Sequence, residues 1–198
     1  MSSATPLPSA PLEGRSGWGV VSEIAGLGAR RAAGVSRCWP HWLSALGCLV
    51  SQFPIIAPGE AAFPLADRVS AERFKPGENN SWEHDANESA YRAGAGYVVT
   101  HENGDEMELT LKRIAQNTFI AQTKGKEGDY LYGLLVFEGN TIYEYAIDCD
   151  DFSLAEQQQY GLVKKDDDCS VTSAQGLAAG YLAQLQKGSK PSGAYVLR

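Results

Sequence analysis

The sequence predicts an α+β fold: an antiparallel meander sheet of five or six strands, curled or closed into a small barrel, with one C-terminal amphipathic helix. Three observations lead to this prediction. Short β-rich runs separated by turns fill residues 96–148, and a single long apolar stripe at helical spacing follows within residues 174–187. The composition also changes sharply near residue 61. This combination of a run of strands and a later helix is typical of an α+β domain.

Five strands are expected at residues 96–101, 106–114, 118–123, 130–137 and 141–148. The pairs Asn103-Gly104 and Gly139-Asn140 tolerate positive φ and favour hairpins. Residues 106–114 alternate apolar and polar side chains, the pattern of a strand with one buried face. Residues 130–137 are apolar on both faces, which predicts a central position in the sheet. Because the loops are short, strands that are neighbours in sequence should pair, which gives an antiparallel meander.

Two helical segments are expected after these strands. Residues 153–159 begin with Ser153 as an N-cap and carry Glu156 three positions later, the spacing of a capping box. Residues 174–187 form the amphipathic helix, and Gly188 is placed to end it. Its apolar stripe consists of Leu177, Tyr181, Leu182 and Leu185. The tail at residues 193–198 is expected to be a last strand that closes the sheet.

Composition divides the chain into two parts. Residues 1–61 hold four arginines against three glutamates, a net charge of +1, and no Lys, Asp, Tyr or Asn. Residues 62–198 hold the other 13 basic and 21 acidic side chains, a net charge of −8, and all nine tyrosines. We expect residues 1–34 to be a disordered or mis-called extension, residues 35–61 a secretory signal segment, and residues 62–198 a single mature domain. Translation from Val35 would give this signal an ordinary length.

The apolar run at residues 42–57 carries no charge but is interrupted by Pro54. A membrane-spanning helix needs about 20 mostly apolar residues, so we expect no stable span and assign the run to a signal h-region. Gly59-Glu60-Ala61 predicts cleavage between Ala61 and Ala62. Two alternatives stay open. Cys48 follows Ala45-Leu46-Gly47, which resembles a lipidation motif, and the run could instead be a buried N-terminal helix of the mature fold.

Cys149 and Cys169 are the cysteines that remain after signal removal, and such a pair in an exported domain predicts a disulfide. Closing a loop of about 20 residues would stabilise the fold by roughly 3 kcal/mol. Aspartates flank both cysteines: Asp148, Asp150 and Asp151 beside the first, and Asp166, Asp167 and Asp168 beside the second. Six carboxylates in one region could bind Ca²⁺, although an EF-hand pattern is missing and such aspartates are usually solvated or cap helices.

Motifs for hydrolases, zinc peptidases and nucleotide binding are missing, since the sequence has no GxSxG, HExxH or GxxxxGK[ST]. The expectation is therefore a protein that is not an enzyme and needs no cofactor. One catalytic alternative remains, an envelope hydrolase in which His101, beside Glu102 at a strand end, serves as general base. The other histidine of the mature part, His84, lies in a polar stretch.

Four tyrosines occupy consecutive strands at a period of two: Tyr130, Tyr132, Tyr143 and Tyr145. Across a hairpin they would share one side of the sheet. Cross-strand aromatic pairs stabilise sheets by about 0.2–1 kcal/mol each, which gives them a structural role. They could also form a surface that contacts a protein or glycan partner, because tyrosines are enriched in interfaces.

Taken together, the residues predict an exported, periplasmic or secreted, non-catalytic binding or accessory module. Its partner would be a protein or a small apolar ligand, and the net charge of −8 argues against nucleic acid and anionic membrane surfaces. The first alternative is a small β-barrel that carries an apolar ligand, which a roomy apolar interior would favour. The second is the hydrolase, which a cleft joining His101 to a hydroxyl or a second carboxylate would favour.

Overall fold

The computed structural model describes residues 49–125, 127–165 and 168–198. Its strands are β1 (Leu49–Ser51), β2 (Arg68–Pro76), β3 (Trp82–Ala93), β4 (Gly96–Thr100), β5 (Glu106–Ala115), β6 (Thr118–Lys124), β7 (Tyr130–Glu138), β8 (Thr141–Tyr145), β9 (Leu162–Lys165), β10 (Asp168–Val171) and β11 (Gly193–Leu197). The helices are α1 (Leu154–Tyr160) and α2 (Ala174–Gln186), with single 3-10 turns η1 (Pro58–Glu60), η2 (Glu78–Asn80) and η3 (Cys149–Asp151).

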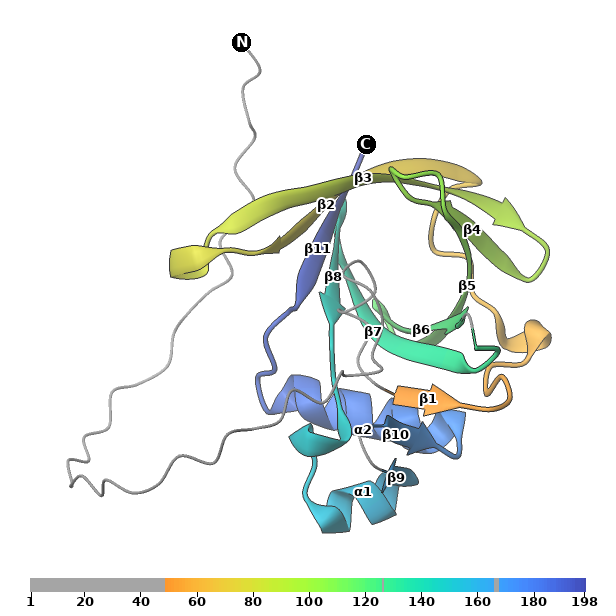
Figure 1. The fold of residues 1–198 in the computed structure, drawn as a ribbon, viewed down its shortest axis with the longest axis vertical. Helices are drawn as coiled ribbons and strands as arrows, with labels where there is room; N and C mark the ends of the chain where they lie inside the picture. Colours follow the sequence, from red (N-terminus) through yellow and green to blue (C-terminus); the bar gives the residue numbers. More distant parts are fainter. Residues whose placement is uncertain (1–48, 126, 166–167) are drawn as a thin grey trace. The chain divides into compact units, whose positions relative to one another are not determined.

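Most of the strands close into a barrel (Figure 1). The sheet runs in the order β6-β5-β4-β3-β2-β11-β8-β7, and the pairing of β6 with β7 joins its two ends. Every neighbouring pair in this ring is antiparallel. Strands β1, β10 and β9 continue the sheet outward from β7, with β1 and β10 parallel to each other. The barrel therefore has a short three-stranded extension on one side.

The predicted antiparallel sheet is confirmed, and of the two forms considered the barrel is the one observed. The predicted number of five or six strands is wrong, because the described residues form eleven. The two longest missed strands, β2 and β3, have polar sequences. In β2 and β3, the side chains that face the barrel interior include Ala71, Arg73 and Glu88. A search for alternating large apolar residues cannot find strands whose buried face is built from small or charged side chains.

The hairpin turns and the central position of β7 are confirmed. Gly104 has φ +86° and Gly139 has φ +62°, values that favour glycine at both predicted turns. Strand β7 pairs with β6, β8 and β1. Residues 134–136 pair with both β6 and β8, whereas residues 130–132 pair with both β6 and β1. No other strand of the described part has three neighbours.

Two hydrophobic cores lie on opposite faces of β6 and β7. The inner core, inside the barrel, consists of Tyr97, Leu111, Phe119, Ala121, Leu135 and Ile142. The outer core lies between the barrel and the helices; it includes Leu49, Ile56, Ile120, Tyr132, Leu134, Phe152, Leu177 and Tyr181. Adjacent residues of one strand alternate between the cores, as Leu134 and Leu135 do. This explains why residues 130–137 are apolar on both faces.

The first described strand lies within the segment that the sequence assigned to the signal. Leu49 of β1 is fully buried in the outer core, and Ile56 is 2% exposed there. Cleavage between Ala61 and Ala62 stays a prediction, but it would remove both residues from the core. The predictions for residues 1–34, the start at Val35 and the lipidation of Cys48 fall outside the described residues.

Both predicted helices are confirmed with small shifts of their ends. In α1 the side chain of Glu156 accepts a hydrogen bond from the Ser153 backbone N–H at 2.9 Å, which completes the expected capping box. In α2 the buried side includes Leu177 and Tyr181. Neither helix in the described ranges has the length and apolar character needed to cross a bilayer.

Candidate functional site

A cavity of about 90 Å³ lies inside the barrel. Its walls include residues from all eight strands of the ring, among them Val69, Ala90, Val99, Met107, Ala121, Leu135, Ile142 and Leu197. Every second residue of each strand faces inward, and most of these inward-facing residues are apolar, so the cavity surface is mostly apolar. The barrel interior is therefore incompletely filled by its own side chains.

The segment before β2 covers part of the barrel interior. Ala62 donates its backbone N–H to the carbonyl oxygen of Leu111 at 2.7 Å, and Ala62, Phe63 and Leu65 pack against the inner core. Leu65 also lines the cavity. The hydroxyl of Tyr97 lies 3.1 Å from both the backbone nitrogen and the carbonyl oxygen of Leu65. These contacts fix one wall of the cavity to a segment outside the sheet.

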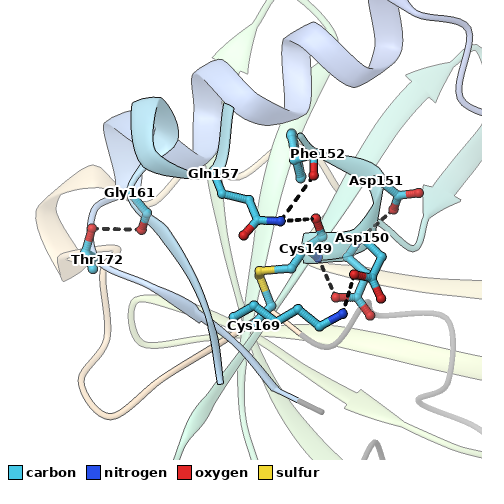
Figure 2. The surroundings of a disulfide bond; sticks show 10 residues. Cys149, Asp150, Asp151, Phe152, Gln157, Gly161, Cys169 and Thr172 are labelled. Atoms are coloured by element: carbon cyan, nitrogen blue, oxygen red, sulfur yellow. Dashed lines mark hydrogen bonds and ion pairs between the residues drawn. A yellow bond between two sulfur atoms is a disulfide. The ribbon is translucent and has the colours of Figure 1, made fainter. Parts of the chain in front are cut away.

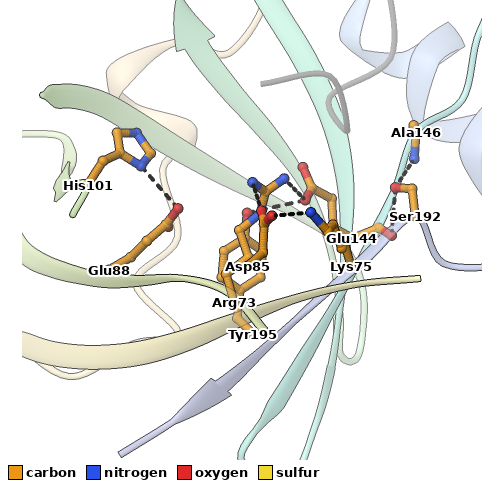
Figure 3. Close-up of polar contacts among 9 residues, drawn as sticks. All are labelled: Arg73, Lys75, Asp85, Glu88, His101, Glu144, Ala146, Ser192 and Tyr195. Atoms are coloured by element: carbon orange, nitrogen blue, oxygen red, sulfur yellow. Dashed lines mark hydrogen bonds and ion pairs between the residues drawn. The ribbon is translucent and has the colours of Figure 1, made fainter. Parts of the chain in front are cut away.

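Polar side chains interrupt the apolar lining in two groups (Figure 3). The first is a pair formed by His101, just after β4, and Glu88 of β3, whose Nδ1 and Oε1 atoms are 3.0 Å apart. Both side chains are 9% exposed and both line the cavity. The sequence placed Glu102 beside His101, but the carboxylate that contacts Nδ1 of His101 is that of Glu88. The antiparallel pairing of β3 with β4 brings Glu88 to His101 across the sheet instead.

The second group, the Arg73 cluster, consists of Arg73, Lys75, Asp85, Glu144 and Tyr195. Arg73 Nη1 lies 2.9 Å from Asp85 Oδ2, and its Nη2 lies 3.8 Å from Glu144 Oε2. Lys75 Nζ contacts the other Asp85 oxygen at 3.1 Å. Tyr195 donates its hydroxyl to Glu144 Oε2 at 3.2 Å. Of these residues, Glu144 and Tyr195 reach the cavity wall.

Burial changes the acidity of this cluster. Glu144 is 3% exposed, and loss of hydration raises its pKa above the usual 4.5, although Arg73 and Tyr195 act in the opposite direction. The negative charge of Glu88 adds to the rise in the pKa of Glu144. Burial also raises the pKa of Tyr195 well above 10, so its hydroxyl remains a hydrogen-bond donor.

The predicted disulfide between Cys149 and Cys169 is confirmed (Figure 2). Both cysteines are fully buried in the outer core, and their Cα atoms are 5.5 Å apart. Gln157 of α1 donates its side-chain amide to the carbonyl oxygens of Cys149 at 2.9 Å and Phe152 at 3.1 Å. The bridge thus joins η3 to β10, on the side of β7 away from the cavity.

Three aspartates near the bridge have structural partners. The side chain of Asp148 accepts from the Cys149 N–H, Asp151 Oδ2 accepts from the Asp148 N–H at 2.7 Å, and Asp150 pairs with Lys164. Asp166 and Asp167 lie outside the described residues. Ligand atoms of Asp148, Cys149 and Cys169 lie within 4.8 Å of one another, but the two sulfurs form the disulfide and are not thiolate ligands. The calcium hypothesis gains no support from this geometry.

The four tyrosines lie on the same face of the sheet, and three of them, Tyr130, Tyr132 and Tyr145, pack in or against the outer core. Tyr132 is fully buried, and its hydroxyl lies 2.6 Å from Ser51 Oγ. Tyr130 and Tyr145 are half-buried against the outer core, and the ring of Tyr143 lies 6.5 Å from that of Trp82. An exposed platform is therefore wrong for Tyr132. A role in partner binding stays a prediction for the other three.

The polar residues of the cavity were mostly missed by sequence reasoning, which identified only His101. His84, the other histidine considered, is exposed on β3 and packs edge-on against Phe74 at 5.8 Å. One signal was present for Glu144. In the strand predicted at 141–148 it lies two residues after Ile142, and therefore on the same face. A glutamate on an apolar inward face indicates a buried polar group that needs partners.

With this geometry established, comparison of the chain with protein-family models, with curated proteins and with solved structures found no match in any of the three.

Proposed function

We propose that this protein binds a small, mostly apolar ligand inside its barrel and acts as a carrier or sensor of that ligand. The observation that carries the proposal is the cavity itself: a mostly apolar lining contributed by every strand of the ring, interrupted by a few polar residues. Ligand sites typically combine such a lining with a few placed polar groups that fix orientation. Of the functions expected from the sequence, the barrel carrier is the one that this arrangement favours.

The size of the cavity limits the ligand. Sites for drug-sized molecules are typically about 300–1,000 Å³, whereas this cavity is about 90 Å³. The proposed ligand is accordingly a small molecule, or the end of a short chain, with an apolar body. The polar residues Glu88, His101, Glu144 and Tyr195 would contact its polar end.

Function outside the cytoplasm is part of the same proposal. Disulfides persist in oxidising compartments and are rare in the cytosol, and the buried bridge between Cys149 and Cys169 fits that setting. A periplasmic or secreted protein that binds a small molecule is consistent with the net charge of −7, which keeps a protein soluble.

Calorimetry with hexanol, a probe that has an apolar chain and one polar end, tests the proposal. Ala121 is 2% exposed and lines the cavity, so Ala121→Leu would place its added carbons in the ligand space. We expect one hexanol site in the native protein and at least about tenfold weaker binding to Ala121→Leu. Glu108→Leu introduces the same residue on the exposed outer face of β5 and should bind as the native protein does.

Thermal unfolding of both variants shows that they fold. Absence of hexanol binding to the native protein at millimolar concentration would contradict the proposal. So would binding that Ala121→Leu leaves unchanged, because the probe would then sit outside the barrel.

Proton-transfer catalysis is the second candidate function. A cavity that joins His101 to a hydroxyl or second carboxylate was the feature expected to favour an enzyme, and the same cavity holds His101, Glu88, Glu144 and Tyr195. A His–carboxylate pair can orient the imidazole as a general base. Turnover of a panel of small esters, abolished by His101→Gln but not by the matched surface change His84→Gln, would support this candidate over simple binding.

A further inference from the structure

We propose that the ligand of the barrel carries a cationic amino group, which the carboxylates of Glu88 and Glu144 hold. This inference rests on the proposed binding function and adds the chemical class of the ligand. Its basis is the charges beside the cavity, the Glu144 atoms that already have partners, and the absence of a lysine or arginine among the lining residues within 49–125, 127–165 and 168–198.

The charges of the two polar groups do not balance. With Glu144 ionised and His101 neutral, the carboxylates of Asp85, Glu88 and Glu144 contribute −3 and Arg73 and Lys75 contribute +2, so the net charge is −1. Among the described residues, these are the charged groups in printed contact here, and β11 adds the uncharged Tyr195. Buried charges such as Arg73, Glu88 and Glu144 are stable only when they are paired. One additional cation would balance the net charge of −1.

Only some of these charges reach the ligand space. Glu88 and Glu144 line the cavity together with His101, whereas no lysine or arginine is among the lining residues of the described part of the chain. Arg73 is not part of the lining, and it is engaged with Asp85 and Glu144 through its two terminal nitrogens. A ligand carboxylate or phosphate would therefore meet two acidic side chains. A ligand ammonium would meet two acceptors of opposite charge.

Among the described residues, Glu144 contacts the side chains of Tyr195 and Arg73 through the same carboxylate oxygen, Oε2, at 3.2 Å and 3.8 Å. The Glu144 carboxylate also feels the like charge of Glu88, which contributes to raising its pKa. A cation bound beside both carboxylates would relieve that repulsion. The attraction between the cation and the carboxylates is stronger in the low dielectric of the barrel interior than in water.

Three probes with the same six-carbon chain and different ends test the inference: hexylamine, hexanol and hexanoate. Binding is measured by calorimetry at about pH 8, because at this pH alkylammonium groups are protonated and carboxylates tend to be ionised. We expect hexylamine to bind about tenfold or more tightly than hexanol, the gain of one charge-assisted hydrogen bond, and hexanoate to bind more weakly than hexanol.

Variants identify the carboxylates that recognise the amine. Glu88→Gln and Glu144→Gln should each lower hexylamine affinity about tenfold while leaving hexanol affinity within about twofold. Glu108→Gln makes the same chemical change on the outer face of β5 and should alter neither probe. It also controls for loose attraction of amines to an acidic protein surface. Should Glu144→Gln fail to fold, Glu88→Gln and the three-probe comparison on native protein still decide the question.

The outcomes separate this inference from the function on which it rests. Hexanol that binds in the barrel together with no preference for hexylamine, or with a preference for hexanoate, would overturn the amine assignment and leave the carrier function standing. A preference for hexylamine that persists in both glutamine variants would also overturn it. No binding of any of the three probes would remove the carrier function itself.

Discussion

Removal of residues 49–61 is expected to destabilise the fold strongly, even though the barrel strands all lie downstream. We compare two truncated proteins, one beginning at Leu49 and one beginning at Ala62. The shorter one lacks β1, which pairs with both β7 and β10. It also lacks the N–H of Ile56, which donates to the buried side chain of Gln122 at 2.9 Å.

The magnitude follows from the residues that leave the core. Leu49 is fully buried and Ile56 is 2% exposed, and full burial of such a side chain stabilises by about 1.5–3 kcal/mol. The two together account for about 3–6 kcal/mol. Gln122 is 6% exposed and would lose its partner, which costs a further 1–3 kcal/mol or so. Against a typical stability of about 5–15 kcal/mol, the protein that begins at Ala62 should be marginally folded.

Urea unfolding followed by circular dichroism measures the difference. The account predicts that the protein beginning at Leu49 unfolds cooperatively and that the one beginning at Ala62 loses at least about 3 kcal/mol. Equal stabilities within about 1 kcal/mol would refute the reasoning. The result also bears on the predicted signal cleavage, because a mature chain from the native host that begins at Ala62 and is fully stable would show that β1 is dispensable.

Three further outcomes are expected. Replacing Cys149 and Cys169 together by alanine should lower the free energy of unfolding by about 3 kcal/mol, measured by urea titration, since the bridge closes a loop with a sequence separation of 20. Tyr132→Phe should lower the free energy of unfolding by about 1 kcal/mol because the hydroxyl contacts Ser51. Tyr132→Ala should lower it by about 3–5 kcal/mol because it empties a fully buried site. A smaller loss in the alanine variant would mean that the outer core is not packed as described. Burial raises the pKa of Glu144 above 4.5, so the folded state holds that proton more tightly than the unfolded chain. This contribution is fully present below about pH 4.5 and is lost as the pH rises through the raised pKa, and Glu144→Gln should flatten the fall in stability over that interval.

The parts of the fold that the sequence predicted share one physical feature, a strong local pattern. Residues 106–114 alternate in hydrophobicity, turns at Gly104 and Gly139 need positive φ, and Ser153 with Glu156 forms a capping box. Each of these signals is contained within a few consecutive residues. The corresponding elements were therefore predicted within a few residues of their ends.

The missed elements depend on tertiary context. The inward positions of β2 and β3 carry Ala71, Arg73 and Glu88. The two charged side chains are stable inside the barrel only because Asp85 and Glu144 pair with Arg73, and His101 pairs with Glu88. Strand β1 has three residues and is held by β7 and β10, far away in sequence. No local pattern encodes such pairings.

The candidate site was predictable only in part for the same reason. The disulfide was predicted because the count and setting of the cysteines restrict the pairing. His101 was noticed, but its partner Glu88 lies 13 residues earlier and becomes a neighbour only when β3 and β4 pair. The tyrosines were correctly placed on one face. Whether that face is covered depends on α2 and on the segment that contains β1, whose packing the sequence does not specify.

Methyl NMR with hexanol as probe tests the central claim, binding inside the barrel, most directly. The protein offers two sets of buried methyl groups: Leu111, Leu135 and Ile142 in the inner core, and Ile56, Leu134 and Leu177 in the outer core. The account predicts saturable chemical-shift changes in the first set, with the second set nearly unchanged. Saturable changes confined to the outer set, or no change in either set at millimolar hexanol, would contradict it.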